Sequence, residues 1–210
     1  TTAALDVIAI LVAIIAGRVI PAFTSSAVEN AQPRRIFAVE AIAIGSLLLI
    51  LIADTQLLPF TMAPAGWLVL FAIAAAAHLV RLGLWNSHRT IHNPLLLMLP
   101  IAYAWLPIAL TLRGLAQLEI LPAASAVHAL TIGLISSLMV AMMTRSALGH
   151  TGRMLVASRG DIGAFVILQF AAIVRVFAGS ISPEYDRGAV IASGMLWTLA
   201  FSILCLCYWP

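Results

Sequence analysis

Two histidines, His78 and His128, have the clearest potential for chemistry in this chain, because each lies inside a long apolar stretch. An ionisable side chain within a bilayer is costly, so each marks a candidate functional site. Arg81 follows His78 by one turn of a helix. One interpretation is an imidazole that ligates a metal beside a guanidinium that binds a haem propionate. The other is a histidine hydrogen-bonded to a neighbouring helix, with Arg81 extended towards the membrane surface.

The second histidine opens the longest polar signature of the chain, which continues through an apolar stretch to Arg145, His150 and Arg153. A regular α-helix from His128 to His150 would span roughly 33 Å, about one bilayer core. We therefore expect these two histidines at opposite membrane faces, without a shared small ligand. Counting helical rises places His128 about 15 Å from the depth of His78, so the two are not expected to be the axial ligands of one haem.

Two further motifs combine proline with a side chain that could contact a cofactor. Arg18 stands three residues before Pro21. It is either an arginine at the membrane surface beside a helix stop or a clamp for an anion or propionate. Tyr103 lies between Pro100 and Pro107, which predict a kinked helix. This segment either packs against other helices or lines a cofactor pocket.

Three other ionisable residues receive structural interpretations. Glu40 begins an apolar stretch, where the helix dipole favours a carboxylate. Its expected partners are Arg18, Arg34 and Arg35. His88 and His92 continue the helical face of His78 if that helix persists towards Pro94. They have the spacing of a metal pair, but the interpretation that we favour is a solvated loop.

The composition indicates which elements position these residues. Of 210 residues, 63% are apolar and 9% are charged, whereas about a quarter are charged in a soluble domain. A window of about 19 residues finds apolar stretches that are long enough to cross a bilayer as helices. They cover roughly residues 3–22, 36–53, 64–84, 94–113, 123–144, 161–180 and 189–209. The predicted fold is all-α, a single polytopic transmembrane helical bundle over residues 1–210.

The arginines predict the orientation of this bundle. All eleven cationic residues are arginines, and they gather in and beside the first, third and fifth connections between the predicted helices. By the positive-inside rule, Thr1 lies outside and Pro210 in the cytoplasm. The chain is apolar from Ala3, without a starting methionine or a basic leader. We therefore expect it to be part of a longer protein that begins upstream.

Several classes of function are not indicated by the sequence. The basic excess is small and forms no nucleic-acid footprint. There is no paired-carboxylate site, nucleophile triad or phosphate loop, so the sequence gives no indication of turnover and leaves open whether the protein is an enzyme. Cys205 and Cys207 point about 200° apart on a helix, and we expect neither a disulfide nor a metal site there. We expect membrane lipid to surround the protein.

The words GRVIPAFT, YAWLP, HALTIG and TRSALGHTGR occur in this order before a terminal YWP. In these motifs, and over essentially its whole length, the chain resembles the NnrS family. These are bacterial inner-membrane proteins of about twelve helices, associated with haem, copper and relief of nitric oxide stress. One departure is Pro100, which stands where the family commonly has a histidine.

The resemblance implies that this chain is the C-terminal part of a larger bundle, with the upstream half of the same protein as its partner. It also implies haem b as cofactor, copper as a second candidate metal, and nitric oxide as a ligand. The predicted cofactor-binding residues are His78, His128, His150, Arg18, Arg81, Arg145 and Tyr103, of which His78 and His128 are the candidate metal ligands. Two alternatives stay open: a transporter or channel whose path is lined by buried His and Arg, and a noncatalytic assembly subunit.

Overall fold

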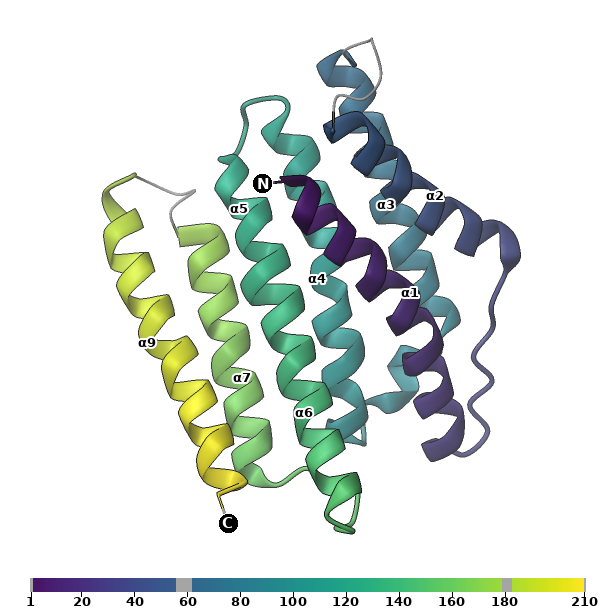
Figure 1. The fold of residues 1–210 in the computed structure, drawn as a ribbon, viewed down its shortest axis with the longest axis vertical. Coiled ribbons are helices and arrows are strands. Elements are labelled where there is room, and N and C mark those ends of the chain that lie inside the picture. Colours follow the sequence, from purple (N-terminus) through teal and green to yellow (C-terminus); the bar gives the residue numbers. More distant parts are fainter. Residues whose placement is uncertain (1, 56–61, 179–182, 210) are drawn as a thin grey trace. The chain divides into compact units, whose positions relative to one another are not determined.

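The structure is a computed structural model that describes residues 2–55, 62–178 and 183–209. All the elements found in these residues are helices, as predicted. In chain order they are α1 (Thr2–Ala27), α2 (Phe37–Asp54), α3 (Pro64–Leu84), the 3₁₀ helix η1 (Ser87–Thr90), α4 (Pro94–Ala116), α5 (Ala123–His128), the π-helix η2 (Ala129–Ser136), α6 (Ser137–His150), α7 (Arg159–Ile173), the π-helix η3 (Val174–Ala178) and α9 (Pro183–Cys207) (Figure 1).

Seven helical segments of the described residues are long and apolar enough to cross a membrane, which confirms the predicted spans. One of them joins α5, η2 and α6 from Ala123 to His150, and another joins α7 and η3. The first span is longer than predicted, because α1 continues through Pro21 to Ala27. A proline removes one backbone donor, and in α1 this local loss does not end the helix. The chain is therefore a multi-pass membrane protein.

The chain divides into two compact units. Unit 1 contains Thr1–Arg89 and Leu106–Ala126, and unit 2 contains Thr90–Trp105 and Val127–Pro210. The helix α4 contributes its first half to unit 2 and its second half to unit 1. The expected single bundle stays a prediction, and each unit is described separately below.

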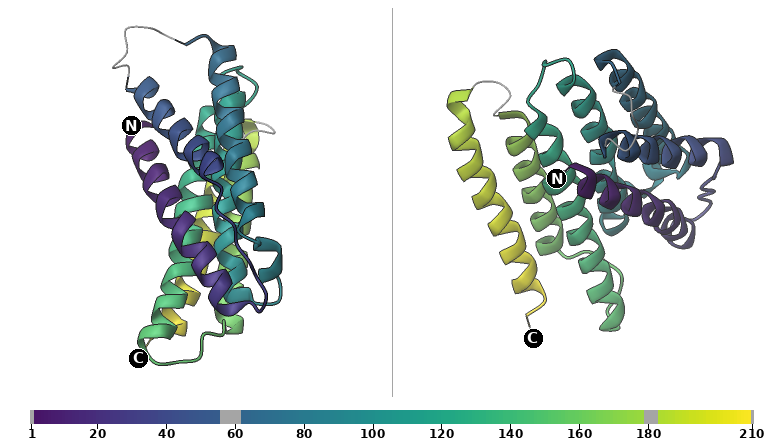
Figure 2. Two further views of the ribbon diagram at one scale, coloured as in Figure 1. Left: turned by 90° about the vertical axis from the view of Figure 1, so that its right-hand side faces the viewer. Right: turned by 45° about the horizontal axis from the view of Figure 1, so that its top comes forward.

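In unit 1, α2 packs between its sequence neighbours α1 and α3 (Figure 2). Small residues make this possible, because Ala13, Ala43 and Ala74 are fully buried where the helices meet. Short side chains let helix backbones approach closely in a membrane. The opposite faces carry exposed large apolar residues such as Leu11 and Leu49, which suit contact with lipid.

The helix α3 ends at Leu84, which agrees with the favoured interpretation of His88 and His92 as residues of a solvated loop. His88 lies in η1 and His92 in the turn after it, and both are exposed. They do not continue the helical face of His78. The change of direction occurs at Asn86, whose φ of 55° is left-handed, a conformation that asparagine tolerates better than most residues.

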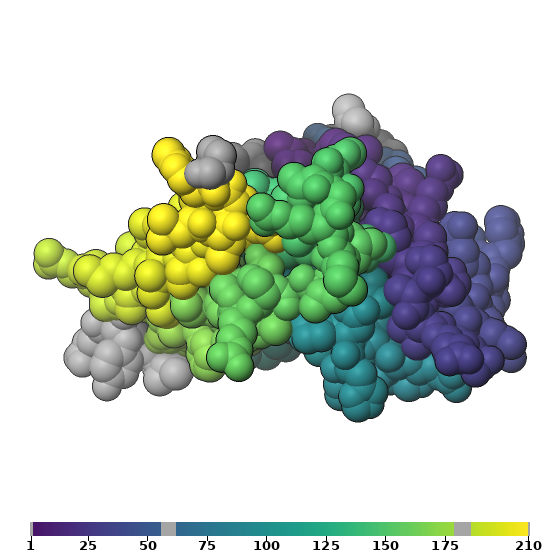
Figure 3. Space-filling view, turned by 90° about the horizontal axis from the view of Figure 1, so that it is seen from below, coloured from purple at the N-terminus to yellow at the C-terminus, as the bar shows by residue number. Residues whose placement is uncertain are grey.

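In unit 2, α7 and α9 lie side by side along most of their length (Figure 1), and α7 also packs against η2 and α6. Seen from the end of the helices, the C-terminal end of α9 lies beside the connection between α6 and α7 (Figure 3). The helix α7 begins with a capping box, in which the Ser158 hydroxyl accepts from the Asp161 amide and the Asp161 carboxylate accepts from the Ser158 amide.

Two π-helices interrupt the α-helical spans of unit 2, where the sequence predicted regular helices. The first, η2, begins directly after His128. It contains Gly133, and a β-carbon at this position would overlap the Trp105 indole. The missing side chain thus lets Trp105 lie against the helix backbone. Such π-helical turns occur frequently at functional sites, which directs attention to His128.

Candidate functional site

Arg81 on α3 is the centre of a buried ion cluster in unit 1. Its side chain is 1% exposed. Its Nε donates to Glu40 Oε1 at 3.0 Å and its Nη2 donates to Glu40 Oε2 at 2.9 Å. This two-pronged pairing with a carboxylate is the strong geometry of a guanidinium. A third hydrogen bond runs from Nη2 to the Ala13 carbonyl at 3.1 Å, and the guanidinium lies 4.9 Å from the centre of the Trp85 ring.

Gly17 on α1 provides the space for this guanidinium. A β-carbon on Gly17 would overlap Arg81 Nη2 and would lie 3.6 Å from Glu40 Oε2. Arg18, the neighbouring residue that the sequence left as either an arginine at the membrane surface or an anion clamp, is exposed. The residue of the GRVIPAFT motif that faces the buried cluster is therefore the glycine and not the arginine.

His78 is fully buried beside Arg81, which confirms that the two share one face of α3. Its Nδ1 lies 3.4 Å from Arg81 Nη1. Because a guanidinium can only donate, Nδ1 must accept, and the ring proton then belongs on Nε2. The backbone of Ala43 also interacts with the ring. Protein groups thus engage the ring from two sides. A metal bond to His78 stays a prediction that this arrangement does not favour.

A second ion cluster in unit 1 was not predicted from the sequence. Arg113 near the end of α4 forms ion pairs with both Asp6 on α1 and Asp54 at the end of α2. All three side chains are 15% exposed or less. The guanidinium also lies 5.1 Å from the centre of the Phe71 ring. The sequence did contain one indication of this cluster, because all three residues stand near the predicted outer ends of their helices.

In unit 2, His128 lies at the junction of α5 and η2, and its side chain is half-buried. It is near enough to Arg175 and Asp186 to interact with both charges. Arg175 Nη1 and Asp186 Oδ1 form an ion pair at 3.1 Å, in which Asp186 is 58% exposed. In contrast with His78, this imidazole is partly accessible, and the guanidinium that influences it is paired with a solvent-exposed carboxylate.

A chain of hydrogen bonds fixes the core of unit 2. Trp105 Nε1 donates to Gln169 Oε1 at 2.8 Å, and Gln169 Nε2 donates to the buried Ser137 hydroxyl at 2.7 Å. Trp197 Nε1 donates to the Ser136 hydroxyl at 3.2 Å. Inside a membrane each of these polar groups needs a partner, so these bonds tie α7 to α4 and to the start of α6, and α9 to the end of η2. Gln169 was missed in the sequence, although a lone amide in an apolar span is a signal for such a bond.

The other predicted site residues of unit 2 lie apart in different surroundings. Tyr103 is fully buried in α4. Arg145 in α6 is half-buried, and His150, the last residue of α6, is exposed. The structure thus brings together His78 and Arg81 from the predicted set, and it adds Arg175 as a charge near enough to influence His128.

Three polar side chains meet at the end of unit 2. They are Thr144, Asp161 and Tyr208, and each has one buried side-chain oxygen. Asp161 and Thr144 are near enough to the Tyr208 hydroxyl to influence its ionisation. Burial raises the pKa of Tyr208 to about 12, and the Asp161 carboxylate acts in the same direction. These surroundings thus favour the neutral phenol form of Tyr208.

This raised pKa predicts a loss of stability at high pH. The ordinary pKa of a tyrosine is 10.0, so Tyr208 ionises first in the unfolded chain, and the free energy of unfolding should fall as the pH rises from 10.0 to about 12. Below pH 10.0 the contribution is fully present. Comparing detergent-solubilised wild type with Tyr208→Phe by circular dichroism tests this, since the variant should lack that part of the pH dependence. Superimposable pH curves for the two proteins would contradict it.

The donor sets in the structure limit which metal sites this chain can build. Within residues 2–55, 62–178 and 183–209, no three His, Cys, Asp or Glu side chains are placed to hold one metal ion. The expectation that Cys205 and Cys207 form no disulfide agrees with the two free thiols. A haem needs only one or two axial ligands from the protein, so this limit bears on a bare metal ion more than on haem.

Comparison with known proteins gives one match. A family model with the description "NnrS protein" matches residues 1–210, the whole chain. No curated protein and no solved structure matches the chain.

Proposed function

The chain belongs to the NnrS family, and from this premise we propose that it is a haem-binding protein of the bacterial inner membrane that protects the cell from nitric oxide. Family membership indicates a protein related to nitric oxide stress. The haem, its nitric oxide ligand and the location in the bacterial inner membrane are proposals that go beyond this family assignment. The arginine distribution supports an orientation with Thr1 outside and Pro210 in the cytoplasm.

One observation carries the haem proposal, namely the surroundings of His128. Its imidazole is half-buried in a membrane span, at the start of a π-helix and beside Arg175. A neutral imidazole can donate a lone pair to haem iron, and a guanidinium can pair with a propionate. The chemistry of this donor pair therefore fits a b-type haem. His128 replaces His78 as the preferred ligand, because protein groups engage the His78 ring from two sides.

Arg175 has the freedom that a propionate partner needs. Its ion pair is with Asp186, which is 58% exposed, and ion pairs of this kind contribute little net stability. A propionate could thus take the place of Asp186 at low cost. Arg81, in contrast, is held by three hydrogen bonds, two to Glu40 and one to the Ala13 carbonyl.

When bound, ferrous haem supplies an iron that takes nitric oxide at an open axial position. The residues of this chain would hold the group and exclude water from it. Tyr103 and Arg145 of unit 2 stay predictions from the sequence as cofactor contacts. Roles for Arg18, Arg81, His78 and His150 stay predictions from the sequence. A copper site would need donors beyond the described residues, which provide no three-ligand site.

An optical spectrum of the purified full-length protein tests the haem proposal. After expression with ample haem, the dithionite-reduced protein should show a Soret band that shifts on addition of nitric oxide. His128→Ala should lose this band. His92→Ala is the matched control, because His92 is an exposed histidine in a turn and should leave the spectrum unchanged.

Two results would count against the proposal. Absence of haem from the full-length wild-type protein would show that haem is not its cofactor. An unchanged spectrum in His128→Ala would show that His128 is not the haem ligand. Arg175→Gln gives a graded readout, in which haem is retained but dissociates about tenfold faster, as expected when one charge-assisted pair to a propionate is lost.

The transporter alternative is supported by one specific observation. Unit 1 holds three largely buried carboxylates near two arginines, within or at the ends of its membrane helices. Ionisable residues inside a membrane can mark an ion pathway. Flux through reconstituted vesicles by a haem-free protein would favour this alternative.

A further inference from the structure

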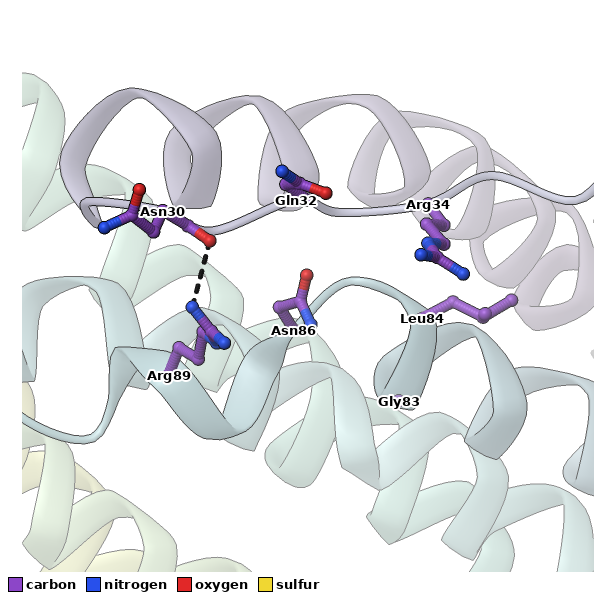
Figure 4. A pocket seen from close by; sticks show the side chains of 7 residues that line it. All are labelled: Asn30, Gln32, Arg34, Gly83, Leu84, Asn86 and Arg89. Atoms are coloured by element: carbon purple, nitrogen blue, oxygen red, sulfur yellow. Dashed lines mark hydrogen bonds between the residues drawn. The ribbon is translucent and has the colours of Figure 1, made fainter.

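A polar pocket at the end of α3 in unit 1 belongs to none of the sites described above (Figure 4). Its volume is about 480 Å³. The polar residues that line it are Asn30, Gln32, Arg34, Asn86 and Arg89. They come from two connections, the one between α1 and α2 and the one that follows α3.

Two hydrogen bonds hold these connections together and so define the pocket. The Arg34 amide donates to the Leu84 carbonyl at 2.8 Å. Arg89 Nη1 donates to the Asn30 carbonyl at 2.9 Å, a bond that spans the opening between the two connections in Figure 4. Asn30 and Asn86 both adopt left-handed backbone angles, with φ of 57° and 55°. Asparagine is one of the few residues that tolerate this conformation, so the loop shape has a local basis in the sequence.

The charge of this pocket differs from that of the other arginine clusters. Arg81 and Arg113 are each paired with carboxylates. The lining of this pocket includes two guanidiniums and three amides but no carboxylate. The side chain of Arg34 forms no ion pair with an acidic residue in the described part of the chain, and that of Arg89 is bonded to a backbone carbonyl. The remaining donors of both arginines are thus available to an anion.

The surroundings of the pocket place it at a membrane surface. It lies where α3 ends and where the α1–α2 connection leads into α2. Ile36 and Phe37, just beyond Arg34, are large apolar side chains with 46% and 87% exposure. Apolar side chains beside arginines at a helix end are typical of the zone in which lipid phosphates lie.

We propose that this pocket binds a phosphate-bearing anion, with Arg34 and Arg89 pairing with the phosphate oxygens and the amides of Asn30, Gln32 and Asn86 holding the polar group attached to it. Guanidiniums favour phosphate because their donors match its oxygens in pairs. The volume exceeds what one phosphate fills, so it suits a glycerol-phosphate or a similar headgroup. The phosphate could come from an anionic lipid or from a soluble compound.

Binding to the delipidated full-length protein in detergent tests the proposal. The probes are phosphatidylglycerol, measured by native mass spectrometry, and glycerol 1-phosphate, measured by calorimetry. At least one should bind to wild type, and Arg34→Gln with Arg89→Gln should weaken it about tenfold or more, since two charge-assisted contacts are lost. Binding of the lipid alone assigns the site to the membrane, whereas binding of both probes assigns it to a soluble phosphate compound as well.

Arg153→Gln is the matched control, because Arg153 is an exposed arginine that the sequence places on the same side of the membrane. It should bind both probes as wild type does. Failure of wild type to bind either probe, or equal binding by the double variant, would overturn the proposal. If the double variant does not fold, Arg34→Gln alone keeps the bond from Arg89 to Asn30 and provides the same comparison.

Discussion

Replacing Arg113 by glutamine is expected to lower the free energy of unfolding by about 3–5 kcal/mol, the usual cost of removing one partner from a buried ion pair. Arg113 bonds to two carboxylates that are themselves largely buried, Asp6 and Asp54. Without the guanidinium these two acids would face each other unneutralised. Titration of sodium dodecyl sulfate into detergent micelles, followed by circular dichroism, measures the difference from wild type.

Two further variants separate the ion pairs from general effects of the substitution. Arg187→Gln removes the same charge from an exposed side chain, and it should change stability by about 0.5 kcal/mol or less. Adding Asp6→Asn and Asp54→Asn to Arg113→Gln should recover most of the loss, because no unpaired charge then remains. Equal effects of Arg113→Gln and Arg187→Gln would show that the cluster does not stabilise unit 1.

Replacing Gly17 by alanine is expected to lower the free energy of unfolding by about 1–3 kcal/mol, the usual cost of inserting a methyl group into a packed interior. The new β-carbon would overlap Arg81 Nη2. Although a long side chain can move, this one is held by Glu40 and the Ala13 carbonyl, so a shift breaks those bonds. The same detergent titration measures the effect.

A matched glycine makes this prediction specific. Gly45 lies in α2, and a β-carbon there would meet nothing within 4 Å. Gly45→Ala should therefore be neutral or stabilise the helix by up to about 1 kcal/mol. In an Arg81→Gln background Gly17→Ala should cost less than in wild type, since the shorter side chain leaves room. Additive effects of Gly17→Ala and Arg81→Gln would refute the proposed clash.

Much of the fold could be predicted because membrane spans depend on length and composition. Each span has a long apolar run, and most are separated by proline or polar clusters. The exceptions are local. Pro21 does not end α1, and η2 replaces regular helix after His128. Hydropathy does not detect a shift in hydrogen-bond register, and the packing of Trp105 against Gly133 is tertiary information.

The candidate sites were predictable only where the chemistry is local in sequence. His78 and Arg81 are one turn apart, and their contact follows from helix geometry. Glu40 was expected to pair with an arginine, and its Oε2 lies 3.8 Å from Arg35 Nη2. Its closer partner is Arg81, 41 residues away. Pairings of this kind depend on which helices become neighbours, which spacing along a chain does not encode.

The family motif GRVIPAFT also shows what a sequence cannot predict about a site. In GRVIPAFT the arginine attracts attention because it can carry out chemistry, yet Arg18 is exposed. Gly17 is the residue next to the buried cluster, and it acts through the absence of a side chain. A motif shows that its residues belong together, whereas only the fold shows which of them faces the interior.

The triad of Arg113 with Asp6 and Asp54 also constrains how the protein is made. Asp6 precedes Arg113 by 107 residues. At a synthesis rate of about 5–20 residues per second, the arginine leaves the ribosome roughly 5–20 s after the first aspartate. During that interval α1 and α2 carry acidic groups into the bilayer without their counter-charge. The order of synthesis therefore leaves both aspartates without their arginine until α4 arrives to neutralise them.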